Sequence, residues 1–92
     1  MSDLEVVRRA VAGTLNRDVE VEVSKPRAGR WEITLVMNGR RSPAILVERW
    51  EMDAMRQVLL VPAHRRGHFL RSYAALERAE SDRNTLRAPS AP

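Results

Sequence analysis

The sequence contains no cysteine, which excludes disulfide bridges, thiolate metal ligands and cysteine nucleophiles. Lysine is nearly absent as well, because Lys25 is the only lysine among sixteen cationic residues and the other fifteen are arginines. The lack of cysteine fits a reducing compartment, so we expect a cytoplasmic protein.

Long hydrophobic runs are also missing, since nowhere do the eighteen or so apolar residues needed to cross a bilayer follow one another. The N-terminal segment carries Asp3 and Glu5 in place of an unbroken apolar stretch. We therefore expect neither a membrane span nor a signal peptide. The sequence also lacks a glycine-rich phosphate loop and a glycine-flanked nucleophile. These absences predict a protein without enzymatic activity and without a cofactor.

A chain of 92 residues fits a single domain, and a hydrophobic content of 43% is ordinary for a folded protein. The C-terminal end contains Pro89, Ser90 and Pro92 and has little to bury. We expect one compact domain over residues 1–82 and a flexible tail over residues 83–92.

The first predicted element is a helix over about residues 3–15. Ser2 and Glu5 have the spacing of a capping box, in which two side chains satisfy backbone N–H groups at a helix start. Gly13 and Asn16 are typical of a helix end. The apolar residues recur at helical spacing, at Leu4, Val7, Val11 and Leu15.

Alternation of apolar and polar residues predicts strands at 18–24 and 30–37. Asn38-Gly39 then predicts a tight turn into a third strand at about 41–49. The apolar run 44–47 favours a central position for this strand, with both of its faces covered. Pro43 predicts an edge or a bulge where the strand begins, because proline has no N–H to donate.

Two registers of this hairpin are consistent with the sequence. A two-residue Asn-Gly loop places Met37 opposite Arg40, and then Trp31 opposite Leu46 and Ile33 opposite Ala44. A three-residue loop with a bulge at Gly39 places Ile33 opposite Ile45, Trp31 opposite Val47 and Arg30 opposite Glu48. We favour the second register, because it pairs larger apolar side chains across the strands.

Residues 51–61 fit either a short helix or a short strand. We favour a helix capped by Asp53, because Met52, Met55 and Leu59 recur at helical spacing. A further apolar stripe that includes Phe69 predicts a helix from about 64–68 to 82. The expected fold is therefore α+β, with an N-terminal helix, a three-stranded antiparallel sheet, and one or two C-terminal helices packed on one sheet face.

The most distinctive feature of the sequence is its arginine doublets. They are Arg8-Arg9, Arg40-Arg41 and Arg65-Arg66. Guanidinium groups suit phosphates and carboxylates, and the formal net charge of +4 favours acidic partners. The first hypothesis is docking of these six arginines on a nucleic-acid backbone or a nucleoprotein. The codon usage of a GC-rich genome is the competing explanation of the arginine content.

The second hypothesis is a protein–protein adaptor or inhibitor, of the kind that phages and other mobile elements encode. Arginines would bind an acidic patch on the partner protein, and Trp50 with Met52 and Met55 would supply an apolar anchor. Trp31 alternates in phase with apolar strand residues, so we expect it in the core. A homodimer formed through the sheet edge is a third alternative.

His64 and His68 are four residues apart and could share one face of a helix. The sequence offers no third ligand nearby, and Arg65 and Arg66 would repel a dication, so we expect no metal site. Binding of an anion near a helix start is the alternative for this segment, beside a solvated turn without a ligand.

Overall fold

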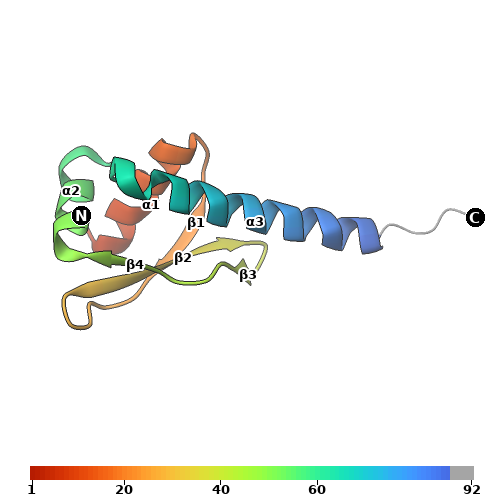
Figure 1. The fold of residues 1–92 in the computed structure, drawn as a ribbon, viewed down its shortest axis with the longest axis horizontal. Coiled ribbons are helices and arrows are strands. Elements are labelled where there is room, and N and C mark those ends of the chain that lie inside the picture. Colours follow the sequence, from red (N-terminus) through yellow and green to blue (C-terminus); the bar gives the residue numbers. More distant parts are fainter. Residues whose placement is uncertain (88–92) are drawn as a thin grey trace, which may run out of the picture.

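The structure of the protein is a computed structural model that describes the backbone of residues 1–87 and the side chains of residues 1–83. It has the expected α+β fold, with helices on one side of an antiparallel sheet (Figure 1). No helix in this part of the chain is long and apolar enough to cross a membrane. The elements in chain order are α1 (Asp3–Leu15), β1 (Glu20–Val23), β2 (Arg30–Met37), β3 (Arg40–Arg41), β4 (Ile45–Glu48), α2 (Arg49–Val58) and α3 (Ala63–Arg87).

Helix α1 has the predicted boundaries. The Ser2 hydroxyl accepts a hydrogen bond from the Glu5 backbone N–H at 3.2 Å, which caps the first turn. Asn16 ends the helix in the left-handed conformation, with φ of 58°, and its N–H donates to the Ala12 carbonyl. The Glu5 side chain bonds the guanidinium groups of Arg8 and Arg9.

Strand β2 is the centre of the sheet, with β1 on one side and both β3 and β4 on the other. The expectation that the third predicted strand lies at the centre is therefore wrong. Its apolar run alternates in burial, because Ile45 and Val47 are buried while Leu46 is 46% exposed on the uncovered face. An unbroken apolar run thus does not by itself place a strand between two neighbours.

The hairpin combines the two predicted registers. At its tip, Met37 pairs with Arg40 across a two-residue turn in which Asn38 and Gly39 both have positive φ. Further from the tip, β2 pairs with β4 in the register shifted by one residue, with Ile33 opposite Ile45, Trp31 opposite Val47 and Arg30 opposite Glu48.

The shift between the two registers arises at Pro43. Ser42 still follows the tip register, because its N–H donates to the Leu35 carbonyl at 2.9 Å and its hydroxyl accepts the Leu35 N–H at 3.0 Å. The extra residue lies between Ser42 and Ile45, so the bulge predicted at Gly39 is instead next to Pro43. Proline suits this break in the ladder, because it has no N–H that would be left unpaired.

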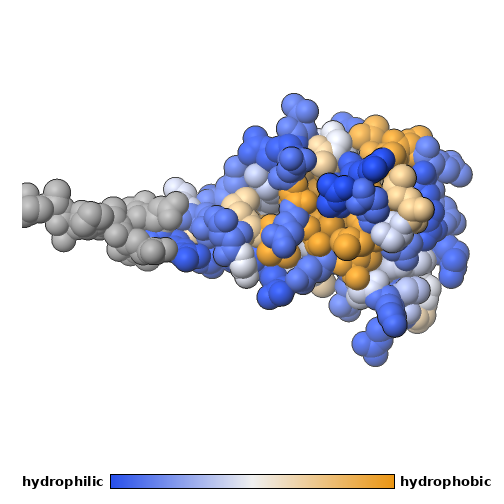
Figure 2. Space-filling view, turned by 180° about the vertical axis from the view of Figure 1, so that it is seen from behind, coloured by the Kyte–Doolittle hydropathy of each residue, from blue (hydrophilic) through white to orange (hydrophobic). Residues whose placement is uncertain are grey.

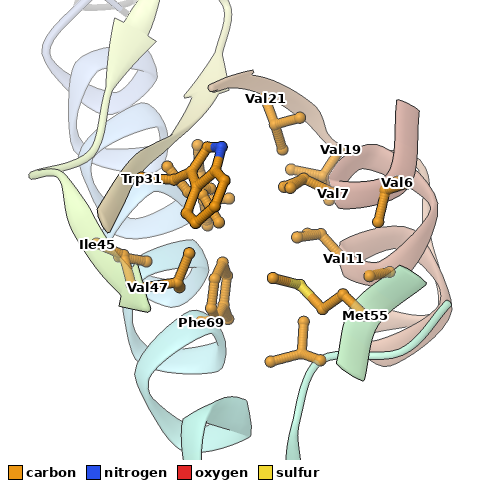
Figure 3. Close-up of a cluster of buried hydrophobic side chains, with 14 of the residues drawn as sticks. Val6, Val7, Val11, Val19, Val21, Trp31, Ile45, Val47, Met55 and Phe69 are labelled. Carbon is orange, nitrogen blue, oxygen red and sulfur yellow. The ribbon is translucent and has the colours of Figure 1, made fainter. Parts of the chain in front are cut away.

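The core lies between the inner face of the sheet and the three helices. Figure 3 shows Trp31, Ile45 and Val47 of the sheet facing side chains from all three helices. Trp31 is buried, as predicted, and its indole N–H donates to the Asp3 carboxylate at 2.9 Å. The helical side of the core includes Val7 and Val11 of α1, Met52 and Met55 of α2, and Phe69 and Leu76 of α3.

The ambiguous segment 51–61 forms helix α2, but the helix begins directly after β4 and its N-cap is Glu48, so the predicted cap Asp53 is wrong. The glutamate serves as cap because its side chain and that of Glu51 form a reciprocal capping box. Leu59 ends the helix with a positive φ of 54°.

Helix α3 is longer than predicted at both ends. It begins at Ala63, directly after Pro62, and continues to Arg87, so residues 83–87 of the expected tail are helical. The first helix-breaking residue after this helix is Pro89, and residues 88–92 of the predicted tail lie outside the described residues. The C-terminal end of α3 extends past the sheet and the other two helices (Figure 1).

Candidate protein-docking site

The three arginine doublets lie in three separate places, and the first is on α1. Arg8 and Arg9 both donate to the carboxylate of Glu5, at 2.6 Å and 3.1 Å for the nearest nitrogens. The hydrogen bond from Arg8 lowers the pKa of Glu5, with a further contribution from Arg9. The charge of this doublet is therefore partly neutralised within one helix.

The second doublet is at the tip of the hairpin. Arg41 makes a two-pronged contact with Glu22 of β1, at 2.8 Å and 2.9 Å, and this contact lowers the pKa of Glu22. Arg40 lies 3.7 Å from the Glu80 carboxylate on α3, and Asn38 donates to the same carboxylate at 2.9 Å. The tip is thus attached to α3 through Glu80.

The third doublet, at the start of α3, contains one buried contact and one free cation. Arg65 donates to Glu51 at 2.6 Å, and the Glu51 side chain is only 1% exposed. Arg66 is exposed and has no ion pair among the described residues. Arg65 and Glu80 are fifteen residues apart on α3, about 22 Å along the helix axis, so the second and third doublets do not form one patch.

Glu51 is the centre of the junction between α2 and α3. Besides Arg65, its carboxylate bonds His64 at 2.7 Å and accepts the backbone N–H of Glu48 at 2.8 Å. Burial raises the pKa of Glu51, but the hydrogen bonds from Arg65, from the Glu48 amide and from His64 outweigh it, so the pKa is below its usual value. Sequence reasoning missed this residue, although the pair Glu48 and Glu51 has capping-box spacing.

Trp50 stands next to this junction and is 57% exposed, as expected. Its ring stacks on His64 with centroids 5.0 Å apart and planes inclined by 18°. Its indole N–H donates to the Glu48 carboxylate at 3.2 Å. These contacts hold the ring in place on the surface, and His64 is itself held by Glu51.

Trp50 begins an apolar stripe on the outer side of α2. Ala54 and Val58 follow at intervals of four residues, which is about one helical turn. Val58 is 63% exposed, and Ala54 is partly exposed. Arg49, which precedes Trp50, is exposed and has no ion pair in the described part of the chain, and its guanidinium carbon lies 5.6 Å from the centroid of the Trp31 ring. We call Trp50, Ala54, Val58 and Arg49 the α2 surface.

Met52 and Met55 do not belong to this surface. Both are fully buried in the core, so the prediction that they supply an exposed anchor is wrong. They are three residues apart on the inner side of α2, opposite the Trp50 stripe. Because this short helix has apolar residues on both sides, the sequence alone does not show which side faces the core.

Hydrophobic residues are also exposed elsewhere, and Figure 2 shows orange surface among hydrophilic residues on the side opposite to the view of Figure 1. The large exposed hydrophobic residues come from several elements: Met1, Leu4, Leu46, Trp50, Val58, Leu60 and Leu70. Among them, Trp50 and Val58 share one helix, and Trp50 is the one fixed by an aromatic stack. This combination distinguishes the α2 surface.

The two histidines are in different surroundings. His64 bonds Glu51 and stacks on Trp50, while the ring of His68 lies 6.5 Å from that of Phe69. Within residues 1–83, no group of three or more histidine and carboxylate side chains is arranged to hold a metal ion.

The fold and this surface describe a small α+β protein with an exposed apolar helix face that has an arginine at its start. No protein-family model, no curated protein and no solved structure matches the chain.

Proposed function

We propose that this protein is a small non-enzymatic adaptor or inhibitor that docks on an acidic patch of a partner protein through the α2 surface. The observation that carries the proposal is the exposed ring of Trp50, which is held by His64 and Glu48 before any partner binds. Tryptophan is enriched among residues that dominate binding energy, and a preordered side chain loses less entropy on binding.

The chemistry of the partner is suggested by the charges beside the stripe. Arg49 is exposed and has no ion pair among the described residues, so its charge is available to a partner, whereas Arg65 is bound to Glu51. A partner with a carboxylate beside an apolar pocket would bind both the Trp50 ring and this guanidinium group. A cytoplasmic location and an origin in a phage or other mobile element remain predictions.

Docking on nucleic-acid phosphates is the other expected function, and it has less support from the geometry. Arg8, Arg9, Arg40, Arg41 and Arg65 each contact a carboxylate of the same chain. A phosphate would have to compete with those carboxylates, and the doublets are distributed over α1, the hairpin tip and the start of α3. A base stacked on Trp50 is the form of nucleic-acid binding that the α2 surface could support.

The test compares tagged wild-type protein with Trp50→Ala and Arg49→Glu in nuclease-treated lysate of the source organism, with bound proteins identified by mass spectrometry. Leu46→Ser is the matched control, because Leu46 is a similarly exposed apolar residue on the opposite face of the sheet. We expect a specific protein that the wild type and the control retain and that Trp50→Ala loses, with affinity reduced at least about tenfold.

Arg49→Glu should slow association and reduce its dependence on salt. In parallel, fluorescence anisotropy measures binding of labelled single-stranded and duplex DNA and RNA at low and high salt. If the wild type binds nucleic acid and Trp50→Ala does not, the α2 surface binds nucleic acid and the adaptor proposal is wrong. If a partner protein binds Trp50→Ala as tightly as the wild type, the proposal that the α2 surface is the docking site is wrong.

A further inference from the structure

A second surface, separate from the α2 surface, lies where the end of α1 meets α3. A hollow of about 320 Å³ is open there, and Leu70 is 45% exposed at its wall. The hollow combines apolar and charged side chains from the end of α1, from the turn that follows it and from α3: Leu15, Arg17, Leu70, Tyr73, Ala74 and Glu77.

The shape of this surface is complementary to itself. Leu70 projects from α3, and Ala74, a small residue one turn further along, leaves room beside the hollow. If a second α3 packs antiparallel about a two-fold axis between these positions, Leu70 of each copy lies against Ala74 of the other. A two-fold interface requires a projection and a recess on the same patch, and both are present.

The charges bordering the hollow are complementary in the same arrangement. Arg66 lies one turn before Leu70, and Glu77 lies three residues after Ala74. Eleven residues separate Arg66 from Glu77, which places them within about 20° of each other around the helix. An antiparallel second copy therefore brings its Glu77 next to Arg66, and its Arg66 next to Glu77.

The state of these two side chains in the single chain is consistent with that pairing. Arg66 has no ion pair within the described residues, whereas Glu77 is 3.2 Å from Arg17 and its side chain is about half exposed. Arg17 is itself held against the Tyr73 ring, with its guanidinium carbon 5.2 Å from the centroid. Glu77 thus has a fixed position and a carboxylate that can accept a second guanidinium.

We propose that the α3 surface between Arg66 and Glu77 binds a second copy of this chain and forms an antiparallel, two-fold dimer. Leu70 is the apolar contact at the centre, and the Arg66–Glu77 pairs border it on both sides. This inference does not depend on the adaptor function, because Trp50, Ala54 and Val58 are not part of the dimer surface.

Sedimentation velocity over a range of protein concentrations tests the proposal. We expect the wild type to approach twice the chain mass of 10.5 kDa with rising concentration. Leu70→Glu should weaken the dimer at least about tenfold, since charged groups at the centre of an interface are left without water. Thermal unfolding followed by circular dichroism verifies that Leu70→Glu remains folded.

Exchanging the charges of Arg66 and Glu77 provides a second test of the dimer. Arg66→Glu and Glu77→Arg should each weaken the dimer, and the double variant should restore it in part, which a nonspecific effect on folding would not do. Leu46→Glu on the open sheet face and Trp50→Ala should leave the dimer unchanged. A wild type that remains monomeric at several hundred micromolar, or a dimer that Leu70→Glu does not weaken, would overturn the proposal.

Discussion

Glu51 and Glu5 make the same chemical contact in two different surroundings. Each is a glutamate in the first turn of a helix, and each carboxylate binds two cationic or ionisable side chains. Glu5 is bound by Arg8 and Arg9 of its own helix, whereas Glu51 is bound by His64 and Arg65 of another helix and is almost fully buried. The Glu5 contact is solvent-exposed and lies within one helix, whereas the Glu51 contact is buried and joins α2 to α3.

The comparison shows that arginine doublets with the same sequence have different roles. At a solvated helix surface, an ion pair between neighbouring turns contributes little and is weakened by salt. At a buried carboxylate, the same guanidinium compensates a charge that would otherwise be without water, so its loss is costly. Whether an arginine contributes to stability therefore depends on how deeply its carboxylate partner is buried, and not on its position in an arginine doublet.

The strongest test of this difference is Glu51→Ala. We expect the free energy of unfolding to fall by about 3 kcal/mol, because Arg65 loses its carboxylate and the capping box of α2 is broken. The partial exposure of Arg65 places the loss at the lower end of what a buried pair can give. Urea denaturation followed by circular dichroism measures it.

The matched control for Glu51→Ala is Glu22→Ala, which also removes a carboxylate from a two-pronged arginine contact, but at an exposed site. If both variants lost the same stability, burial of the carboxylate would not explain the difference between the two contacts. Trp50 emission adds a second readout, because His64 should lose its position when Glu51 is removed.

Local signals were sufficient for much of the fold. The cap at Ser2 gave the correct start of α1, the alternation from Arg30 gave both ends of β2, and Asn38-Gly39 gave the turn. The edge position of β4 was not predictable in this way, because it depends on which strands pair. The Glu51 contact with Arg65 spans fourteen residues and depends on how α2 and α3 are oriented, which no local pattern records.

The pH dependence of stability gives a smaller effect with a definite sign. The pKa of Glu51 is lower in the folded protein than in the unfolded chain, where a glutamate has a pKa of about 4.3. Its stabilising contribution is therefore complete above that value and is lost as the pH falls through the folded pKa.

Urea unfolding of the wild type and of Glu51→Gln between neutral pH and about pH 3 isolates this contribution. The range extends below the pKa of an unperturbed glutamate, about 4.3, and the variant has no carboxylate that titrates at position 51. The wild type should lose its advantage over the variant as the solution becomes acidic. Asp3, Glu5 and Glu22 also have lowered pKa values, so both proteins should lose stability, and the difference between them is the relevant quantity. A difference that stayed constant over this range would show that Glu51 is not held ionised by its partners.

The exposure of Trp50 was predictable, because charged neighbours flank it at the end of a strand. The composition of the α2 surface was not, since Met52 and Met55 were equally plausible neighbours until the side of α2 that faces the core was known. Val58 replaces them because it is on the same side as Trp50. Local sequence patterns did not distinguish Val58 from Met52 and Met55, and only the packing of α2 against the core shows which of them is exposed.

Glu5→Gln should have the smallest effect of these substitutions. Glu5→Gln leaves the helix cap at Ser2 intact and removes only the charge that Arg8 and Arg9 share. We expect the midpoint of urea unfolding to change by a small fraction of the change in Glu51→Ala, and the change should vanish at high salt because the contact is solvated. Because a surface pair is screened and a buried one is not, the effect of Glu51→Ala should persist at the same salt concentration. If salt abolished both effects equally, the two glutamates would have to be regarded as equivalent surface contacts, and the junction between α2 and α3 would need another source of stability.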